Sequence, residues 1–432
     1  MGNYSADQDR ALLIGVSLPH IPLWEAEDSL EELARLADAA LLTTVERVIQ
    51  SRDRIDSAFF VGKGKVDEIK QISKKTEIDL LIFDNDLSPA QMRNLENKTE
   101  MRVLDRSALI LDIFARHART RTARVQVELA QLNYLLPRLT RMWTHLSRQA
   151  GGGAIRGMGS AGVRGPGETQ LETDRRIIHR QINSLEKKLK RINTQMATGR
   201  KNRQGTYSVA LVGYTNAGKS TLMKALSGSD VLVEDQLFAT LDSTTRSIQL
   251  GSKNKILLTD TVGFINRLPH HLFASFRATL EEAVEADLLL HVVDLSFSNY
   301  KSQMRTVETV LKDLKLEDRP TVTVFNKIDR ILGESQQSLI EAYNQRENCV
   351  AISAAKNIGL GKLSDQIIEI MNKNFKKFSL RIPQSEGRLL SKIKENSNII
   401  IENYEDNDVI LELRMEKLSA QKLELERFCM DQ

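Results

Sequence analysis

The stretch GYTNAGKST, residues 213–221, has the spacing Gly-x-x-x-x-Gly-Lys-Ser/Thr that holds nucleotide phosphates. An apolar segment precedes it and TLMKALSG follows, so we expect a strand to lead into the loop and a helix to leave it. Backbone N–H groups and the helix N-terminus would attract phosphate oxygens. Lys219 would place a charge between the β- and γ-phosphates, and Ser220 would offer a hydroxyl to Mg²⁺. The predicted phosphate-binding residues are Gly213, Tyr214, Thr215, Asn216, Ala217, Gly218, Lys219, Ser220 and Thr221.

A second motif indicates the base. VTVFNKID (322–329) predicts a buried strand that ends in Asn-Lys-x-Asp. Guanine presents two adjacent donors that one carboxylate, Asp329, can accept, whereas adenine would leave that carboxylate unpaired. Asn326 would tie this loop to the phosphate loop, Lys327 would cover the base, and the Ala354 N–H would donate to guanine O6. The predicted base-binding residues are Asn326, Lys327, Ile328, Asp329, Ser353, Ala354 and Ala355.

Two further segments predict a switch that senses the γ-phosphate. In DTVG (260–263), Asp260 is expected to bind Mg²⁺ through water, and the Gly263 N–H to meet the γ-phosphate. In LFATLDSTTR (237–246), Thr240 is the preferred second Mg²⁺ ligand, with Thr244 and Thr245 as alternatives. Lys219 and Gly263 are the predicted catalytic residues, and Ser220 and Thr240 the metal ligands. The switch residues in the predicted nucleotide site are Phe238, Ala239, Thr240, Leu241, Asp242, Asp260, Thr261, Val262 and Gly263.

Phe264 follows the glycine of DTVG, where Ras-like GTPases have a glutamine that orients the attacking water. A phenyl ring can neither donate nor accept, so the sequence predicts slow intrinsic hydrolysis that waits for a partner to order the missing group. Spacing alone favours none of the internal candidates for that group, which are Arg246, Arg267, His270 and His271.

The charge of the chain is concentrated in one segment. The net charge is only +4, yet residues 119–206 hold 18 Lys/Arg and 5 Asp/Glu. This segment includes a glycine-rich loop at 151–170, so we favour a polyanion as its partner, and nucleic acid first, over a merely solvated helical face. The predicted RNA-binding residues are Arg156, Arg164, Arg175 and Arg176.

Apolar periodicity predicts several α/β domains joined by helices. Residues 10–116 alternate strands and helices, with strands at 11–18, 79–84 and 101–105 and helices at 27–41 and from Ser88. VGKGKVDEI (61–69) is interpreted as a turn into a helix, with RNA or nucleotide binding as the alternative. Residues 178–196 repeat apolar side chains as a heptad seam, which predicts an antiparallel helical hairpin. The predicted domains are a small α/β domain (1–120), a basic helical hairpin (121–200), a P-loop α/β domain (206–376) and a small α+β domain (377–432).

Composition excludes some classes of protein. With 41% hydrophobic and 27% charged residues, the chain is typical of a globular protein. It contains no run of 18 apolar residues and no secretory signal at its start, so we expect neither a membrane span nor secretion. The two cysteines lie far apart, which predicts no disulfide framework or zinc site and fits the cytoplasm.

Beyond these motifs, the chain resembles the HflX family of ribosome-associated GTPases over essentially its whole length. The resemblance is carried by SRDRIDSAFFVGKGKV (51–66), GVRGPGETQLETDRR (162–176), LFATLDSTTR and DTVGFINRLP. It implies GTP hydrolysis with Mg²⁺, binding of the 50S subunit or 70S ribosome through the N-terminal domain and hairpin, and splitting of stalled or stressed ribosomes. It also implies Ser220 and Thr240 as Mg²⁺ ligands and a hydrophobic residue at position 264. Two alternatives remain open: a GTP-regulated RNA-binding factor in subunit assembly, and a nucleotide-gated scaffold for an acidic protein.

Overall fold

The computed structural model describes residues 9–150, 166–201, 206–228, 238, 243–251, 254–266, 283–331, 340–343, 345–416, 420 and 423–430. The chain divides into two units. The first unit comprises residues 1–192 with the segments 235–242 and 266–277, and the second unit comprises the remainder. Among the described helices, none has both the length and the hydropathy that crossing a bilayer requires.

The first unit begins with a four-stranded parallel sheet in the order β2-β1-β3-β4. Strand β3 is buried throughout, and Leu30, Leu33 and Leu36 of the first helix pack into the core, as the sequence predicts. The third helix starts with the expected Ser88 cap and Pro89, and Gln91 completes a capping box. The elements are Arg10–Ser17 (β1), Leu23–Ala39 (α1), Thr43–Ser51 (β2), Lys63–Thr76 (α2), Leu80–Phe83 (β3), Pro89–Thr99 (α3), Arg102–Asp105 (β4) and Arg106–His117 (α4).

One strand of this sheet is not predicted by the sequence, and one segment beside it decides between two interpretations. Strand β2 lies at the edge of the sheet and only Val48 of it is buried, so it lacks the apolar run that marks the other strands. The segment 61–69 enters α2, with Val66 and Ile69 in the core. The interpretation of this segment as a turn into a helix is therefore confirmed.

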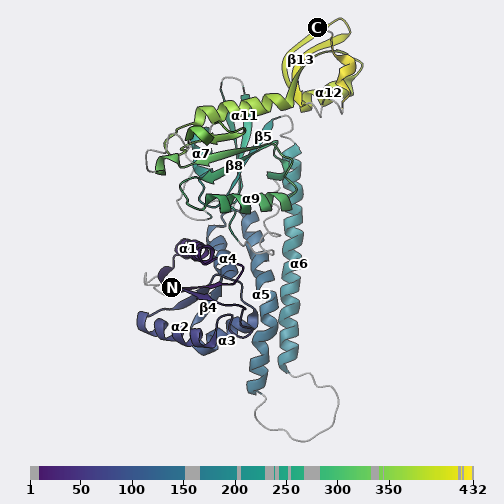
Figure 1. Ribbon diagram of the computed structural model, residues 1–432. Coiled ribbons are helices and arrows are strands. Elements are labelled where there is room, and N and C mark those ends of the chain that lie inside the picture. The colour runs from purple at the N-terminus through teal and green to yellow at the C-terminus, as the bar shows by residue number, and fades with distance from the viewer. Residues whose placement is uncertain are drawn as a thin grey trace. The chain divides into compact units, whose positions relative to one another are not determined.

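Two long helices form the predicted hairpin (Figure 1). They are Arg121–Ala150 (α5) and Pro166–Lys201 (α6). Val125 and Leu129 of α5 pack against Ile182 and Leu185 of α6, which confirms the heptad seam over this stretch. The side chain of Met196, at the end of the predicted seam, lies outside the described residues.

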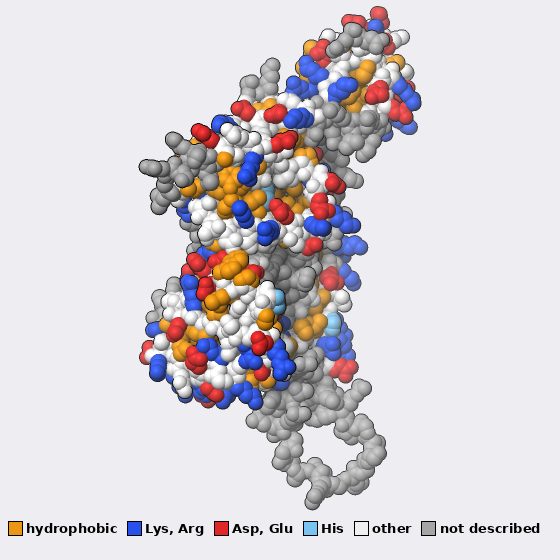
Figure 2. All heavy atoms as spheres, viewed as in Figure 1, with side chains coloured by type: hydrophobic (Ala, Val, Ile, Leu, Met, Phe, Trp, Pro, Cys, Tyr) orange, Lys and Arg blue, Asp and Glu red, His pale blue; other side chains and the backbone are white. Residues whose placement is uncertain are grey.

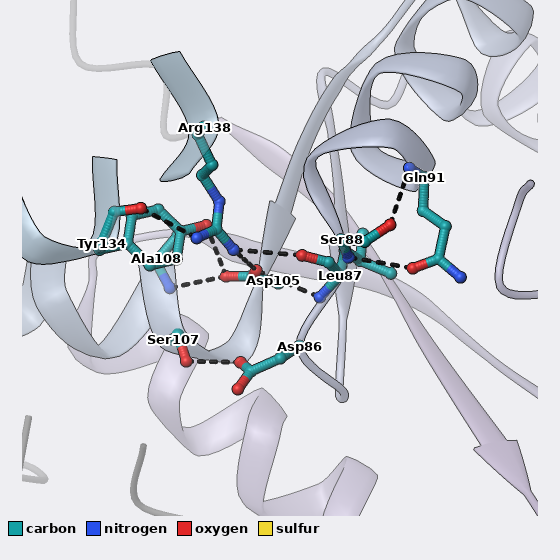
Figure 3. Close-up of polar contacts among 9 residues, drawn as sticks. All are labelled: Asp86, Leu87, Ser88, Gln91, Asp105, Ser107, Ala108, Tyr134 and Arg138. Carbon is teal, nitrogen blue, oxygen red and sulfur yellow. Dashed lines mark hydrogen bonds and ion pairs between the residues drawn. The ribbon is translucent and has the colours of Figure 1, made fainter. Parts of the chain in front are cut away.

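A buried carboxylate joins the sheet to the hairpin (Figure 3). Asp105 ends β4 and is fully buried. Its Oδ1 caps α4 by accepting from the Ala108 N–H at 2.8 Å and also accepts from the Tyr134 hydroxyl at 2.8 Å. Its Oδ2 accepts from the Arg138 guanidinium at 2.8 Å and from the Leu87 N–H at 3.3 Å. One side chain therefore attaches α5 to both β4 and the loop after β3.

The second unit contains a six-stranded sheet in the order β10-β9-β8-β5-β7-β6. All its neighbouring strands are parallel except β6, which runs antiparallel to β7. Leu211, Leu258, Leu290 and Val324 come from four of these strands and share one core. The elements are Tyr207–Gly213 (β5), Lys219–Ser227 (α7), Thr244–Leu250 (β6), Asn254–Asp260 (β7), Leu288–Asp294 (β8), Tyr300–Asp313 (α9), Thr321–Asn326 (β9), Ile328–Arg330 (η1), Cys349–Ala351 (β10) and Leu360–Asn374 (α11).

The same unit ends in a three-stranded antiparallel sheet, β11-β13-β12. The sequence pattern predicts a helix at 386–395 followed by two strands, NIIIENY and VILELRM, which are present, but it does not predict β11. It also predicts a helix over 417–428, whereas the structure has a 3₁₀ helix at the end of this range, and residues 417–419 and 421–422 lie outside the described residues. The elements are Phe375–Pro383 (β11), Gly387–Asn396 (α12), Asn398–Glu405 (β12), Asp408–Glu416 (β13) and Leu425–Phe428 (η2).

We predict that Asp105→Ala strongly destabilises the protein. The substitution leaves the half-buried Arg138 guanidinium without its carboxylate and removes the cap of α4, so the free energy of unfolding should fall by about 3–5 kcal/mol. Urea unfolding followed by circular dichroism measures this change. The matched control is Asp112→Ala on α4, which breaks an exposed pair with Arg116 and should cost less than about 1 kcal/mol. Equal losses in the two variants would contradict this role for Asp105.

Candidate functional site

The four predicted loops lie at the carboxyl ends of neighbouring strands in the second unit. The phosphate loop follows β5, DTVG follows β7, NKID follows β9, and the serine loop follows β10. Parallel strands bring their carboxyl ends to one edge of the sheet, which is where ligands bind in folds of this kind. The sheet order therefore brings together motifs that are up to 140 residues apart in the sequence.

Asn326 holds the phosphate loop in place. Its Nδ2 donates to the Ala217 carbonyl at 2.9 Å, and its Oδ1 accepts from the Ala354 N–H at 3.0 Å. Gly218 has a φ of +95°, and a Cβ at this position would lie 2.2 Å from Asn326 Nδ2. Both the left-handed backbone and the close approach therefore require glycine. The predicted tie between these two loops is present.

Lys219 lies buried beneath the phosphate loop. Its Nζ donates to the carbonyls of Gly213 and Tyr214, at 3.1 and 2.9 Å. Burial lowers the pKa of Lys219 to about 8, against the opposing charge of Asp260. His291 on β8 is also buried, and burial together with the Lys219 charge lowers its pKa to about 4. His291 is therefore neutral at physiological pH and does not compete with Lys219 for an anion.

Ser220 and Asp260 form the polar pair of the site. The Ser220 hydroxyl donates to Asp260 Oδ2 at 2.6 Å, and Asp260 is buried. The described residues contain no cluster of three or more His, Cys, Asp or Glu side chains that could hold a metal by themselves. Mg²⁺ at phosphate sites takes only one or two protein oxygens, with the remainder from phosphate and water. The oxygens of Ser220 and Asp260 fit that coordination.

The backbone at Gly263 and Phe264 is attached to the phosphate loop. The Phe264 N–H donates to the Gly213 carbonyl at 3.0 Å, and the Thr215 N–H donates to the Phe264 carbonyl at 2.7 Å. A Cβ on Gly263 would lie 2.8 Å from Thr215 Cα. The ring of Phe264 is buried, with 3% of the residue exposed. Position 264 therefore acts through its main chain, and its side chain is packed away from water.

The two loops predicted to select the base, NKID and the serine loop after β10, are bonded to each other. Ser353 Oγ donates to Asp329 Oδ1 at 2.6 Å, and Lys327 Nζ lies 2.8 Å from Asp294 Oδ2. Lys327 has a φ of +65°, so the chain turns sharply between β9 and the carboxylate. The Ala354 N–H, expected to donate to guanine O6, is engaged by Asn326 and would have to share its hydrogen with the base.

The predicted switch segment is described only in part. Phe238 is 3% exposed and packs edge-to-face on Phe114 of α4, with ring centroids 4.6 Å apart. Thr245 exchanges a hydrogen bond with Thr259 across the sheet at 2.9 Å, and Thr244 pairs with Asp260 in the β6–β7 register. Thr240, Ala239, Leu241 and Asp242 lie outside the described residues.

The remaining predicted residues are placed as follows. Thr261 is buried and donates to the Leu211 carbonyl at 2.6 Å. Arg175 and Arg176 are exposed on α6, and in Figure 2 Lys and Arg side chains follow the described part of this helix. The buried residues are Gly213, Tyr214, Thr215, Ala217, Val262, Ile328, Ser353 and Ala354; Thr221 is half-buried, and Asn216 and Ala355 are exposed. Arg156, Arg164, Arg267, His270 and His271 lie outside the described residues.

Sequence reasoning does not single out two residues of the site. His291 interrupts the apolar strand LLLHVVD, and a polar residue there signals a position facing something other than the core. Asp294 ends the same strand and pairs with Lys327. Asp294 could have been identified from its position, because it ends a buried strand at the same edge of the sheet as the motifs.

Comparison with known proteins agrees with this geometry. Residues 27–115 match the family described as GTP-binding GTPase N-terminal, residues 117–203 match GTP-binding GTPase Middle Region, and residues 208–327 match 50S ribosome-binding GTPase. The chain is 40% identical to GTPase HflX of Magnetococcus marinus over 97% of its length and 96% of that protein. It belongs to the HflX family of GTPases.

Other relatives of this HflX-family chain extend the comparison. GTPase HflX of Escherichia coli is 42% identical over 92% of each chain. Among solved structures, a GTP-binding protein from the archaeon Sulfolobus solfataricus in complex with GDP is 25% identical, with a TM-score of 0.44 over 85% of this chain and 99% of that one.

The buried ammonium of Lys219 predicts pH-dependent nucleotide affinity. In the free protein its pKa is about 8, and the phosphates of a bound nucleotide would favour the charged form. Binding then takes up a proton once the pH exceeds that pKa, so the Kd for GDP should rise about tenfold per pH unit above it. Calorimetric titration of GDP at several pH values measures this slope. Lys219→Arg keeps its charge and should bind more weakly with no such slope, and a flat profile in the wild type would contradict the prediction.

Proposed function

We propose that this HflX-family GTPase is a nucleotide switch that binds the large ribosomal subunit through its basic hairpin and splits stalled or stressed ribosomes. The observation that carries the proposal is that one chain contains two features. One is the pair of loops with Asp329 and Ser353, which suits guanine, and the other is a segment with a large excess of Lys and Arg. The description 50S ribosome-binding GTPase for the family that matches residues 208–327 supports the same partner.

In this proposal the phosphate loop and its neighbours bind the nucleotide. Lys219 gives its ammonium to the β- and γ-phosphates, in place of the two carbonyls that now accept its hydrogens. The Gly263 N–H meets the γ-phosphate, because the chain at Gly263 lies against Thr215 and the Lys219 ammonium. Asp329, oriented by the Ser353 hydroxyl, accepts both donors of guanine.

The Ser220–Asp260 pair supports a magnesium site. Ser220 would give its hydroxyl to Mg²⁺ directly, and Asp260 would hold it through water, with Thr240 as the proposed second protein ligand. When bound, Mg²⁺ neutralises charge on the phosphate oxygens. The protein's own part is to keep the serine and aspartate oxygens together before the nucleotide arrives.

Hydrolysis in this proposal is slow until a partner acts. The Phe264 side chain is buried and its N–H and carbonyl are both bonded to the phosphate loop, so nothing at this position holds a water. Preorganised electrostatic groups alone then stabilise the transition state. A ribosomal component that orders the water or Gly263 would supply the missing acceleration.

Guanine selection predicts a switch of base preference in Asp329→Asn. The amide cannot accept two hydrogens from guanine, so GDP affinity should fall about 100-fold, while xanthine, which carries a carbonyl in place of the amino group, should gain relative affinity. Titration with GDP, ADP and XDP measures the ratio. Asp313→Asn on α9 is the control and should behave as the wild type. Tight ADP binding by the wild type would contradict guanine selectivity.

Subunit-dependent hydrolysis is the direct test of the proposed partner. We expect purified large subunits to raise the rate of phosphate release, and addition of the protein with a non-hydrolysable GTP analogue to convert 70S ribosomes into subunits on a sucrose gradient. Replacing Arg175 and Arg176 by glutamine should weaken binding and reduce its salt dependence, because each cation displaces counterions from phosphate. An unchanged hydrolysis rate would contradict ribosomal activation, and binding to subunit precursors alone would favour an assembly factor.

A further inference from the structure

Helix α4 begins with a buried charged side chain. Arg106, its first residue, is 2% exposed, and its guanidinium is held by the carboxylates of Asp84 and Glu32. Asp84 also accepts from the Ser29 hydroxyl at 2.7 Å. A buried guanidinium among two carboxylates has little freedom to move, because any loss of a partner would leave charge unpaired in the interior. The start of α4 is therefore rigidly fixed to α1 and β3.

The two short segments 235–242 and 266–277 belong to this first unit, although the chain on either side of each belongs to the second. Both attach to α4. The Asn266 carbonyl accepts from the Arg106 guanidinium at 3.2 Å. Phe238 packs edge-to-face on Phe114, two turns further along the helix, with the ring planes at 90°.

These two contacts lie close in the chain to the residues that the proposed function assigns to Mg²⁺ and the γ-phosphate. Asn266 is three residues after Gly263, and Phe238 is two residues before Thr240. Phe238 also has a φ of +59°, a conformation that costs energy for a bulky residue and persists only where packing imposes it. The packing on Phe114 therefore holds Phe238 itself in this conformation, two residues before the threonine that the proposed function assigns to Mg²⁺.

The same helix is attached to the hairpin. Asp105 caps α4 through the Ala108 N–H and receives the Tyr134 hydroxyl and the Arg138 guanidinium from α5. The Arg138 guanidinium also lies 3.4 Å from the centre of the Tyr134 ring, which fixes the two α5 side chains together. A displacement of α5 would thus act on the cap of α4.

We propose that α4 is a positioning element that couples the hairpin to the GTPase site: Phe114 and Arg106 hold Phe238 and Asn266, which lie close in the chain to the proposed γ-phosphate residues, and Asp105 holds the hairpin. This inference rests on the proposed function, which assigns those γ-phosphate residues to the nucleotide. A change of nucleotide then alters the packing on Phe114, and the change is transmitted to α5 through Asp105. Because such coupling is reciprocal, binding of a partner to the hairpin alters nucleotide affinity in return.

The test compares Phe114→Leu with a matched control, Phe60→Leu. Phe60 is buried in the same sheet domain and makes an edge-to-face contact with Phe83, with centroids 6.3 Å apart, and the described core cluster around it does not include Phe238. The measurement is amide hydrogen exchange over α4 and residues 121–138 of α5, in the full chain, with GDP and with a non-hydrolysable GTP analogue.

In the wild type and in Phe60→Leu we expect exchange over these residues to differ between the two nucleotides. In Phe114→Leu the difference should shrink about 3- to 10-fold, which is the size of one lost edge-to-face contact. Identical exchange with both nucleotides in the wild type overturns the inference, and so does a difference in Phe114→Leu as large as in the wild type. Neither outcome depends on ribosomes, so each is distinct from a failure of the proposed function.

Tyr134→Phe tests the hairpin side of the coupling. It removes one hydroxyl donor from Asp105 and keeps the ring beneath Arg138. We expect this variant to bind large subunits as the wild type does, but to show a stimulation of GTP hydrolysis reduced about 3- to 10-fold, the effect of one lost hydrogen bond of ordinary strength. Stimulation equal to that of the wild type, with binding intact, would refute a path through Asp105.

Discussion

One amide side chain determines the geometry of the nucleotide site. Asn326 donates to the phosphate loop and accepts from the loop after β10, so three stretches of chain have fixed positions relative to one another. Both groups of a carboxamide are used, and no other neutral side chain of this size combines a donor with an acceptor in one plane. The requirement for glycine at 218 follows from the same contact, because the amide nitrogen occupies the space of a Cβ.

Phe264 shows how a residue that cannot do chemistry can still belong to a chemical site. Its N–H and carbonyl pair with Gly213 and Thr215, so the strand that carries the γ-phosphate sensor is joined to the strand that carries the phosphate loop. The buried ring stabilises that pairing. A polar side chain at position 264 that reached towards the attacking water would have to leave this buried place. One residue here therefore cannot both orient the water and pack into the core.

The sequence predicts that the four motif loops follow strands and that Asn326 ties two of them together, and both features are present because they follow from local chemistry. Few functions other than phosphate binding need glycines, a lysine and a serine at this fixed spacing. Asn326 ends a strand next to the phosphate loop, so its hydrogen bond to that loop can also be predicted. The edge strands β2 and β11 escape prediction because their burial is set by partners distant in the chain. His291 escapes because its low pKa arises from burial and from the charge of Lys219, both of which are produced only by the folded sheet. The hydrogen bonds around Asp105 are equally invisible in the pattern, since Tyr134 and Arg138 look like ordinary members of an amphipathic helix.

The position of Asp105 in the chain also has a consequence for synthesis. The carboxylate belongs to β4, and every residue of the parallel sheet that presents it precedes the hairpin in the chain. Domains emerge and fold from the N-terminus during translation. The site that receives Tyr134 and Arg138 can therefore be complete before α5 leaves the exit tunnel, so that α5 would find its anchorage already formed.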